Sequence, residues 1–267
     1  MANAASTLVA DLKPSDGYVQ SFARGLEVIR SFNASAPRQT LTEVAGRSRL
    51  SRAGARRILL TLQALGYVRC EGKEFTLTAR ILDLGFAYLS SMPIWNLAEP
   101  AMELLVEQVK ESCSAAVLDG TDIVYVLRVP THKIMSISLG VGSRLPAYCT
   151  SMGRMLLSAL PEAELMQFLA ASDRKAHTKH TVTDVADLAA KIAQVHKQGW
   201  SMVNQELEEG LVSMAAPITN RSGQIVAALN ISGQANRTSA KAMQDTMLIK
   251  LLEAAQTISR MLHSQGT

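Results

Sequence analysis

The order of predicted elements in the first 80 residues constrains the fold of this 267-residue chain more than any other sequence feature. Apolar residues recur at helical spacing from Val19 to Phe32, which predicts a first helix. Thr40 precedes Glu43 by three residues, the pattern of a capping box, so a second short helix is expected to begin there. Ser51 is the expected N-cap of a third helix.

The third predicted helix has one apolar face and one face that carries arginines. It runs to about Leu65, and Gly66 is expected to end it. Two short alternating strands follow, joined by a turn at residues 71–73. Two helices, a short turn, an arginine-bearing helix and a hairpin form the order of a winged helix-turn-helix domain. A small helical subdomain with a solvated basic face is the alternative.

Charge is distributed unevenly along the chain. Residues 1–90 carry 12 basic and 7 acidic side chains, whereas the remainder carries 15 and 16. Residues 18–66 alone hold eight arginines and no lysine against two glutamates, as expected of a phosphate-binding surface. Small residues at the start of a recognition helix permit close approach to the major groove, where arginines reach guanine edges or phosphates. We therefore expect DNA contacts from Thr40, Ser51, Arg52, Ala53, Arg56, Arg57 and Lys73.

From residue 80 onward, predicted helices and strands alternate, which is typical of a mixed α/β domain. Pro93 and Pro100 are expected to break a long helical stretch into a linker helix and the first helix of the next domain. Strands are expected at 114–120, 123–130, 137–142, 214–218 and 225–233, and helices at 151–160, 162–171, 184–198 and 241–262.

Composition excludes several classes of protein. A hydrophobic content of 48% is ample for packed cores, which excludes a disordered chain. No apolar run reaches the roughly 18 residues that span a bilayer, and the first residues lack the pattern of an export signal. The cysteines Cys70, Cys113 and Cys149 are an odd, widely spaced set, which suggests buried thiols in a reducing cytosol. We therefore expect a cytoplasmic protein without a membrane partner.

No motif in the sequence predicts catalysis. Ser151, Ser213 and the five histidines invite a hydrolase interpretation, but the chain lacks a G-x-S-x-G nucleophile elbow. His177 and His180 lie in a basic, polar stretch without a third ligand, so solvent exposure explains them better than a metal site. A lone G-x-G at residues 140–142 is too little for a dinucleotide site. We expect no catalytic residue, no metal and no cofactor.

A site for a small organic acid is a better match to the second half of the chain. Such a site needs a few convergent donors, with an arginine or a helix N-terminus for each carboxylate. Residues 150–153 open a predicted helix, so their N–H groups and hydroxyls suit an anion. The candidates from this chemistry are Arg128, His132, Arg144, Tyr148 and Ser151. For the two arginines, an internal salt bridge or a subunit contact is the alternative.

Five stretches of the sequence resemble the IclR family of bacterial transcriptional regulators. They are SFARGLEVIRSF at 21–32, the segment at 40–68, FTLTARILDLG at 75–85, GSRLPAYCTSMGRMLLSALP at 142–161 and the segment at 206–233. Both domains match in the family's order over residues 18–262. The segments 85–105 and 117–139 are most similar to the branch that controls aromatic-acid catabolism, which includes regulators of 4-hydroxybenzoate, protocatechuate and β-ketoadipate use.

This resemblance implies an α+β chain with four parts: a flexible N-terminal arm (1–17), a winged helix-turn-helix DNA-binding domain (18–79), a linker helix (80–94) and a GAF-like effector-binding domain (95–265). It places effector contacts on Ser151, Met152, Ser213, Asn230 and Ser232. Satisfied polar groups in a half-buried sheet are the alternative for the last three. Relative to the glyoxylate-responsive regulator, Val203-Asn204 replaces an acidic residue, which favours a different ligand.

Together these observations predict a ligand-responsive regulator, without a cofactor, that binds promoter DNA at a palindromic operator as a homodimer or homotetramer. Its expected effector is an aromatic or ring-cleavage-derived carboxylic acid, and its expected location is the bacterial cytoplasm, on the nucleoid. One alternative is a metabolite-binding enzyme that carries a winged-helix interaction domain and turns over its acid. Another is an architectural DNA binder that does not respond to any ligand.

Overall fold

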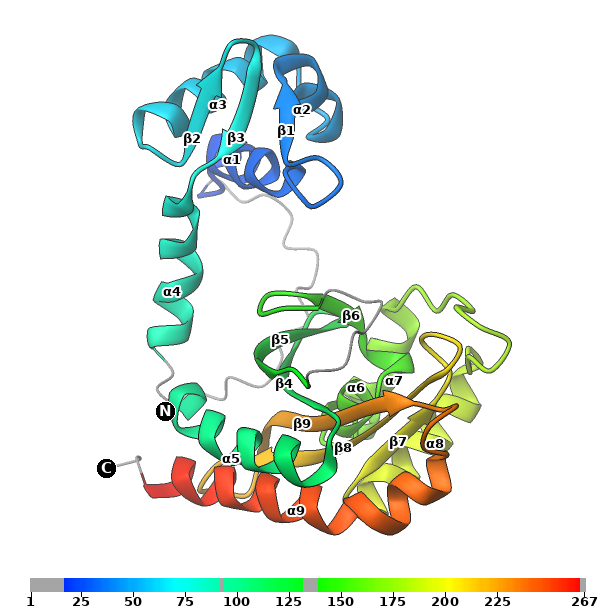
Figure 1. The fold of residues 1–267 in the computed structure, drawn as a ribbon. Helices are drawn as coiled ribbons and strands as arrows, with labels where there is room; N and C mark the ends of the chain where they lie inside the picture. The colour runs from blue at the N-terminus through cyan, green and yellow to red at the C-terminus, as the bar shows by residue number, and fades with distance from the viewer. Residues whose placement is uncertain (1–16, 92–93, 132–138, 265–267) are drawn as a thin grey trace. The chain divides into compact units, whose positions relative to one another are not determined.

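The chain forms two compact units (Figure 1). The structure, a computed structural model, describes residues 17–91, 94–131 and 139–264, so the predicted arm, except Gly17, lies outside the described residues. One unit is described over residues 17–91 and the other over residues 94–131 and 139–264. Among these residues, no helix has the length and apolar character required to cross a membrane.

The N-terminal unit contains the elements that the sequence predicts for a winged helix-turn-helix. Its elements are α1 (Gln20–Ser31), β1 (Arg38–Thr40), α2 (Leu41–Arg47), α3 (Arg52–Ala64), β2 (Val68–Glu71) and β3 (Glu74–Leu77). The three strands form an antiparallel sheet in the order β1-β3-β2. Sequence analysis did not predict β1, because three residues between a loop and a capping box give no strand periodicity.

Local chemistry explains where these helices begin and end. Thr40 and Glu43 form the predicted capping box at the start of α2, and the Ser51 hydroxyl accepts a hydrogen bond from Gly54 N–H at the start of α3. Gly66 follows α3 with a φ of 81°, a left-handed conformation that favours glycine. The apolar faces of the three helices then pack together around Val28 and Leu59, which are fully buried.

A short 3-10 turn, η1 (Ala79–Ile81), leads into α4 (Leu82–Ser90). All four large apolar side chains in the first seven residues of α4 are exposed: Leu82, Leu84, Phe86 and Tyr88. No residue of this helix is buried. Because the apolar residues surround the helix, α4 has the composition of a buried element on an exposed surface.

The C-terminal unit is built on one six-stranded antiparallel sheet with the strand order β6-β5-β4-β9-β8-β7. Its strands are β4 (Ser112–Asp119), β5 (Asp122–Val129), β6 (Arg144–Pro146), β7 (Ser201–Asn204), β8 (Leu211–Thr219) and β9 (Ile225–Gln234). Its helices are α5 (Ile94–Val109), the 3-10 turn η2 (Ala147–Cys149), α6 (Ser151–Leu157), α7 (Glu162–Ala171), α8 (Val185–Gln198) and α9 (Ala240–Ser264).

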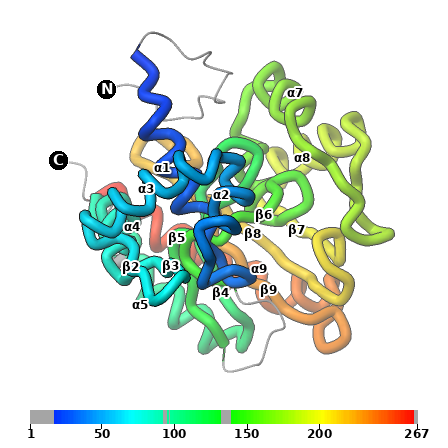
Figure 2. The backbone as a smooth tube through the Cα atoms, turned by 90° about the horizontal axis from the view of Figure 1, so that it is seen from above, coloured from blue at the N-terminus to red at the C-terminus, as the bar shows by residue number. Residues whose placement is uncertain are grey.

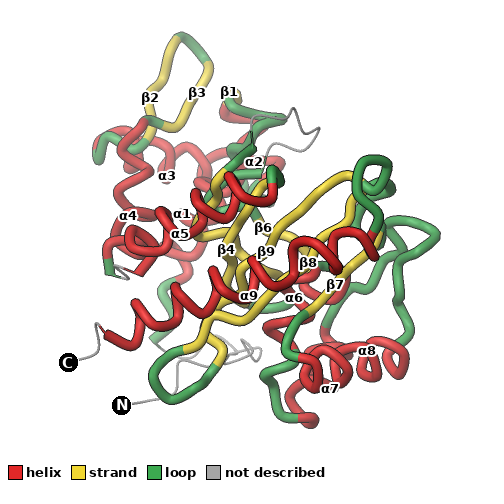
Figure 3. The backbone as a smooth tube through the Cα atoms, turned by 60° about the horizontal axis from the view of Figure 1, so that its bottom comes forward, coloured by secondary structure: helices red, strands yellow, loops and turns green. Residues whose placement is uncertain are grey.

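Helices cover both faces of this sheet. The two long helices α5 and α9 pack side by side on one face (Figure 3). On the other face α6 lies against β7, β8 and β9. Helices α7 and α8 pack together (Figure 2), and α8 also contacts α6. The core on the α6 side is formed by apolar side chains of α6, α7 and α8 with strand residues, among them Met152, Phe168, Ile192 and Ala228. The unit is therefore a sheet enclosed between two helical layers.

Two predictions for this unit were wrong. Pro100 was expected to break the helix, yet α5 continues through it. The reason is burial: Ala98 and Met102 are fully buried, and this packing outweighs the hydrogen bond that proline cannot donate. A strand was expected at 137–142, but Leu139–Gly142 form a loop and turn, whereas residues 137 and 138 lie outside the described residues. The short edge strands β6 and β7 were not predicted.

Gly153 permits the closest approach between α6 and the preceding turn. A Cβ atom at this position would overlap the carbonyl oxygen of Ala147. We predict that Gly153→Ala lowers the free energy of unfolding by about 2 kcal/mol, because the overlap forces α6 away from η2. Chemical denaturation followed by circular dichroism measures this change. Gly140→Ala is the matched control, since a Cβ atom there meets no atom within 4 Å; equal stability of the two variants would contradict the prediction.

Candidate functional site

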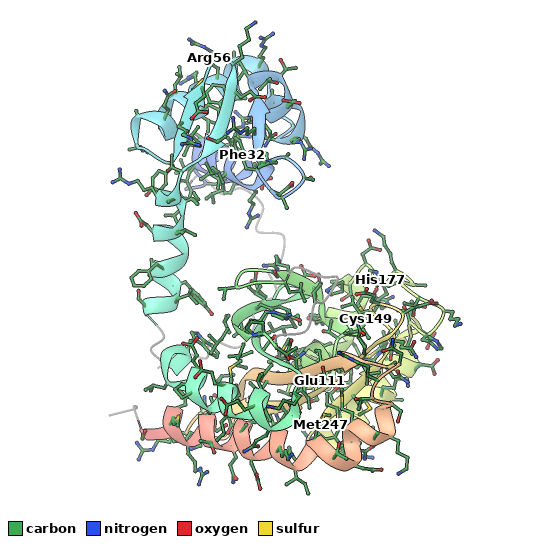
Figure 4. The ribbon with its side chains drawn as sticks, viewed as in Figure 1. Phe32, Arg56, Glu111, Cys149, His177 and Met247 are labelled. Carbon is green, nitrogen blue, oxygen red and sulfur yellow. The ribbon has the colours of Figure 1, made fainter. Side chains whose placement is uncertain are left out.

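The exposed face of α3 is the first candidate site. Arg52, Ala53, Arg56 and Arg57 are all exposed there, and Figure 4 labels Arg56 at the edge of the unit and the buried Phe32 within it. None of the three arginines makes an ion pair with an acidic side chain among the residues that the structure describes. Their charge is therefore available to a phosphate or to the acceptor edge of a base.

The hairpin and the start of α2 have less free charge. Arg38 lies 3.7 Å from Glu71, and Arg69 lies 3.3 Å from the same carboxylate. Lys73 is exposed at the turn of the hairpin, as predicted from its position. The Thr40 hydroxyl donates to Glu43 Oε2 at 2.8 Å, so this predicted DNA contact is already used as a helix cap.

The capping interaction also affects the pKa of the Glu43 carboxyl group. The backbone N–H of Thr40 donates to Glu43 Oε2 at 2.7 Å. This backbone hydrogen bond, followed by the hydrogen bond from the Thr40 hydroxyl, lowers the pKa of Glu43. Glu43 is exposed, and its charge is stabilised at the N-terminal end of α2.

A cavity between the sheet and α6 is the second candidate site. Its space between the atoms amounts to about 560 Å³, a figure that includes the opening to solvent. Strands β5, β7, β8 and β9 contribute to its walls, together with the start of α6 and the loop before β8. The lining residues that carry polar side-chain groups are Tyr125, Arg128, Cys149, Thr150, Ser151, Ser213, Asn230 and Ser232, and the rest are apolar.

A row of polar side chains crosses the sheet at this cavity. Ser114 on β4 is paired in register with both Arg128 on β5 and Asn230 on β9, so the three side chains lie on one face. Arg128 Nη1 donates to Ser114 Oγ at 3.4 Å, and Asn230 Oδ1 accepts from Ser114 N–H at 3.1 Å. Asn230 Nδ2 in turn donates to Ser232 Oγ at 3.0 Å. The sheet thus holds a hydrogen-bonded polar patch in an apolar surrounding.

The α6 side of the cavity carries a polar atom without a partner. The Thr150 hydroxyl accepts from Gly153 N–H at 3.2 Å and so caps α6. Ser151 is 1% exposed, and its hydroxyl has no hydrogen-bond partner among the described residues. An unpaired buried hydroxyl costs free energy, and a polar group of a ligand in the cavity would remove this cost.

The remaining walls are apolar or only weakly acidic. Burial raises the pKa of Tyr125 to about 12, although the nearby Arg128 charge acts in the opposite direction. Burial also raises the pKa of the Cys149 thiol to about 12. Both groups are therefore neutral at physiological pH. Among the described lining residues, Arg128 supplies the formal charge, which is positive.

The structure brings together six of the predicted effector residues in this cavity and places the others elsewhere. Its lining includes Arg128, Ser151, Met152, Ser213, Asn230 and Ser232. Arg144 does not line it: its guanidinium forms ion pairs with Asp119 at 2.5 Å and with Asp122 at 3.1 Å on an exposed edge, which is the salt bridge considered as its alternative. His132 lies outside the described residues.

Tyr148 is next to the lining residue Cys149 but does not line the cavity. Its hydroxyl donates to the carbonyl oxygen of Lys175 at 2.5 Å, and its ring stacks on the exposed His177 at 6.3 Å between centroids. Figure 4 labels His177 and Cys149. His177 therefore packs on a tyrosine, and the described residues include no group of three or more His, Cys, Asp or Glu side chains suited to a metal ion.

Sequence analysis missed several residues of the cavity wall. Leu139, Leu145, Leu207 and Leu211 line it as apolar residues, and Tyr125 lines it as well. No local signal distinguishes them from ordinary core residues, because only the tertiary fold decides which apolar side chains border a space. Tyr125 lies three residues before Arg128, a spacing that predicts opposite faces of a regular strand. The irregular register of β5 with β4 at Val126 brings both residues to the cavity.

Two family models cover most of the chain. Residues 21–72 match the model of the IclR helix-turn-helix domain. Residues 86–260 match the model described as the bacterial transcriptional regulator IclR C-terminal domain. The first match contains α3 and the first strand of the hairpin, and the second contains every residue that lines the cavity.

Similar proteins agree with these matches. The Pca regulon regulatory protein of Pseudomonas putida is 42% identical over 246 residues, which cover 92% of this chain and 84% of the relative. A Rhodococcus sp. RHA1 protein assigned as a transcriptional regulator has a crystal structure with a TM-score of 0.82 and 48% identity, covering 92% of this chain and 98% of that one. An IclR homologue from Microbacterium hydrocarbonoxydans, crystallised with 4-hydroxybenzoate, has a TM-score of 0.79 and 26% identity, covering 91% and 98%.

Proposed function

This chain belongs to the IclR family of bacterial transcriptional regulators, and we propose that it controls an aromatic-compound catabolic operon in response to an aromatic or ring-cleavage-derived carboxylic acid. The observation that carries this proposal is the cavity beside α6, where a cationic Arg128 and a Ser151 hydroxyl with no hydrogen-bond partner among the described residues line the same space as several leucines. The relatives named above support the choice of ligand class, since one is a Pca regulon regulator and another was crystallised with 4-hydroxybenzoate.

The wall chemistry fits such an acid. The Arg128 guanidinium is suited to a carboxylate, which it binds through charge-assisted hydrogen bonds. Tyr125, Leu145 and Leu207 offer apolar area to a ring or carbon chain. Ser151 and Ser213 can serve a second polar group of the ligand. We therefore assign the effector to this cavity and leave Arg144 and Tyr148 out of it.

The N-terminal unit supplies the DNA contacts in this proposal. The exposed start of α3 enters the major groove, where Arg52, Arg56 and Arg57 reach bases or phosphates, and Lys73 of the hairpin follows the flanking backbone. Thr40 acts as the cap of α2, which positions the helix in front of α3. A regulator with this partner acts in the bacterial cytoplasm, on the promoter DNA of the nucleoid.

The apolar surface of the N-terminal unit supports a homo-oligomer. Phe22 on α1 and Phe86 on α4 are each 68% exposed, and every large apolar residue at the start of α4 is exposed as well. A second copy of this chain is the occupant that also explains a palindromic operator, because two copies related by a two-fold axis present two recognition helices. A dimer, or a tetramer built from two dimers, is therefore the proposed functional form.

Arg57→Ala tests the DNA interface. We expect a loss of operator binding of about 1–3 kcal/mol, since one arginine contact to a base or phosphate disappears. Fluorescence anisotropy with a labelled promoter fragment, measured at several salt concentrations, gives the affinity and its salt dependence. Arg260→Ala on α9 removes the same charge from the other unit and is the control. Wild-type affinity of the Arg57 variant would refute the assignment of the recognition helix.

A thermal-shift screen tests the effector site. The full-length protein is heated with 4-hydroxybenzoate, protocatechuate, terephthalate, β-ketoadipate or glyoxylate, the last as a control. A true effector raises the melting temperature saturably, and at 100 times its Kd it stabilises the folded state by about 2.7 kcal/mol. If no aromatic or ring-cleavage acid raises the melting temperature, the proposed ligand class is refuted.

Two arginine variants then test where in the C-terminal unit the effector acid binds. Arg128→Ala should abolish most of the melting-temperature shift and leave promoter binding intact, because Arg128 lines the cavity. Arg144→Ala removes an arginine of the same unit whose ion pairs lie on the exposed edge, and it should retain the shift. If Arg144→Ala abolishes the shift and Arg128→Ala retains it, the effector binds at the edge of the sheet near Arg144 and not in the cavity.

Substitution of the exposed phenylalanines tests the assembly. We expect Phe22→Asp with Phe86→Asp to produce a monomer by light scattering after gel filtration, since a charge cannot be buried unpaired in an apolar interface. Met166→Asp on α7 replaces another exposed apolar side chain and should leave the oligomer unchanged. An oligomer that survives the double substitution would exclude this surface as the interface.

A further inference from the structure

A buried ion pair lies directly behind the cavity. Arg154 on α6 and Glu206 in the loop between β7 and β8 form a two-pronged contact, with Nη1 to Oε1 at 2.7 Å and Nη2 to Oε2 at 2.6 Å. The two side chains are only 3% and 8% exposed. This geometry is that of a bidentate guanidinium–carboxylate pair. Such a pair fixes the relative orientation of the two side chains as well as the distance between them.

Further hydrogen bonds connect this pair to two other segments. Arg154 Nε donates to the carbonyl oxygen of Tyr148 at 2.9 Å, next to the lining residue Cys149. Glu206 Oε2 accepts from Val182 N–H at 3.0 Å, and the Thr181 hydroxyl donates to the carbonyl oxygen of Glu206 at 2.6 Å. One buried charge pair therefore joins α6, the turn before it, the loop before β8 and the segment before α8.

The residues held by the pair belong to two different walls of the cavity, one on α6 and one on the loop before β8. Ser151 and Met152 precede Arg154 in α6, and Leu207 directly follows Glu206. The pair itself is not part of the lining. A change in the separation of Arg154 and Glu206 therefore moves one wall relative to the other, without removing any group that faces a ligand.

We propose that Arg154 and Glu206 are positioning residues that set the width of the ligand cavity, holding the Ser151 wall at a fixed separation from the Leu207 wall. This inference rests on the proposed function in one respect only, namely that the cavity takes the effector acid. A merely structural pair would stabilise the whole unit. A positioning pair changes access to the cavity and the fit of the ligand by more than its effect on global stability alone would produce.

Two buried cysteines allow these roles to be separated. Cys149 lines the cavity, whereas Cys113 is buried in β4 and is not part of the lining. Burial raises the pKa of both thiols, so both react slowly in the folded protein. Opening of the cavity exposes Cys149 alone, but unfolding of the unit exposes both. Cys113 is therefore an internal standard for global unfolding.

The experiment measures iodoacetamide alkylation of the full-length protein, with the label at each cysteine quantified by mass spectrometry. All variants carry Cys70→Ser, which removes the partly exposed thiol of the hairpin. Because the Glu206 charge raises the pKa of Cys149 and the Arg154 charge lowers it, each alkylation rate is measured across pH and divided by the thiolate fraction. We expect Glu206→Gln to raise this corrected rate at Cys149 several-fold relative to Cys113. Arg144→Gln, which breaks the exposed ion pairs with Asp119 and Asp122, is the matched control and should change neither rate.

Two results would overturn the proposal: equal acceleration of Cys149 and Cys113 in Glu206→Gln, which indicates global destabilisation, or no acceleration of Cys149. If Glu206→Gln does not fold, Arg154→Lys serves instead, because lysine keeps the charge but cannot form the two-pronged contact. Selective acceleration of Cys149 in this variant supports the proposal, and its absence refutes it.

A second arm adds 4-hydroxybenzoate as the probe. In the wild-type background the acid should protect Cys149 from alkylation, and the protecting concentration should rise several-fold in Glu206→Gln. Equal protecting concentrations would overturn the proposal. If neither 4-hydroxybenzoate nor any other acid of the thermal-shift screen protects Cys149, the proposed effector site fails. The alkylation rates without acid would still decide the role of the pair.

Discussion

Burial of the Arg154 guanidinium is the constraint on which the C-terminal unit depends. A charge cannot remain in an apolar interior without a partner, because its desolvation costs several kcal/mol. Glu206 meets this requirement from a loop 52 residues away in sequence, with both nitrogens of the fork paired. The loop must therefore close over α6, and the apolar residues on either side of it enclose a space. The pair thus ties the loop that carries Leu207 to the helix that carries Met152, and both of these residues line the cavity.

The two candidate sites differ in whether their polar side chains have hydrogen-bond or ion-pair partners within the described chain. In the cavity, the polar side chains of the sheet form hydrogen bonds within the sheet, from Ser114 to Asn230 and on to Ser232. The Ser151 hydroxyl at the start of α6 has no partner among the described residues. On α3 the arginines are exposed and form no ion pair within the described chain. The first arrangement suits a small ligand that replaces a missing hydrogen bond, and the second suits a large polyanion that releases counterions.

Local chemistry made much of the fold predictable. The helix start at Thr40, the cap at Ser51 and the turn at Gly66 depend on residues within a few positions of one another, and the structure confirms each of them. Pro100 was misjudged because tertiary burial of its neighbours outweighs a local preference. The partnership of Arg144 with Asp119 and Asp122 depends on how strands pair, so sequence could offer it only as an alternative. The Arg154–Glu206 pair gave no local signal.

Regulation in this protein requires only a small free-energy difference. The arginine helix and the cavity lie in separate units, so a ligand changes operator affinity only if it binds one arrangement of the assembly more tightly than another. A tenfold change in operator affinity corresponds to about 1.4 kcal/mol. One hydrogen bond contributes about 1 kcal/mol, and more when it satisfies a buried group. In the proposed site, a single ligand contact to Ser151 made in only one arrangement would supply most of this difference. Because coupling is reciprocal, operator DNA must change ligand affinity by the same factor.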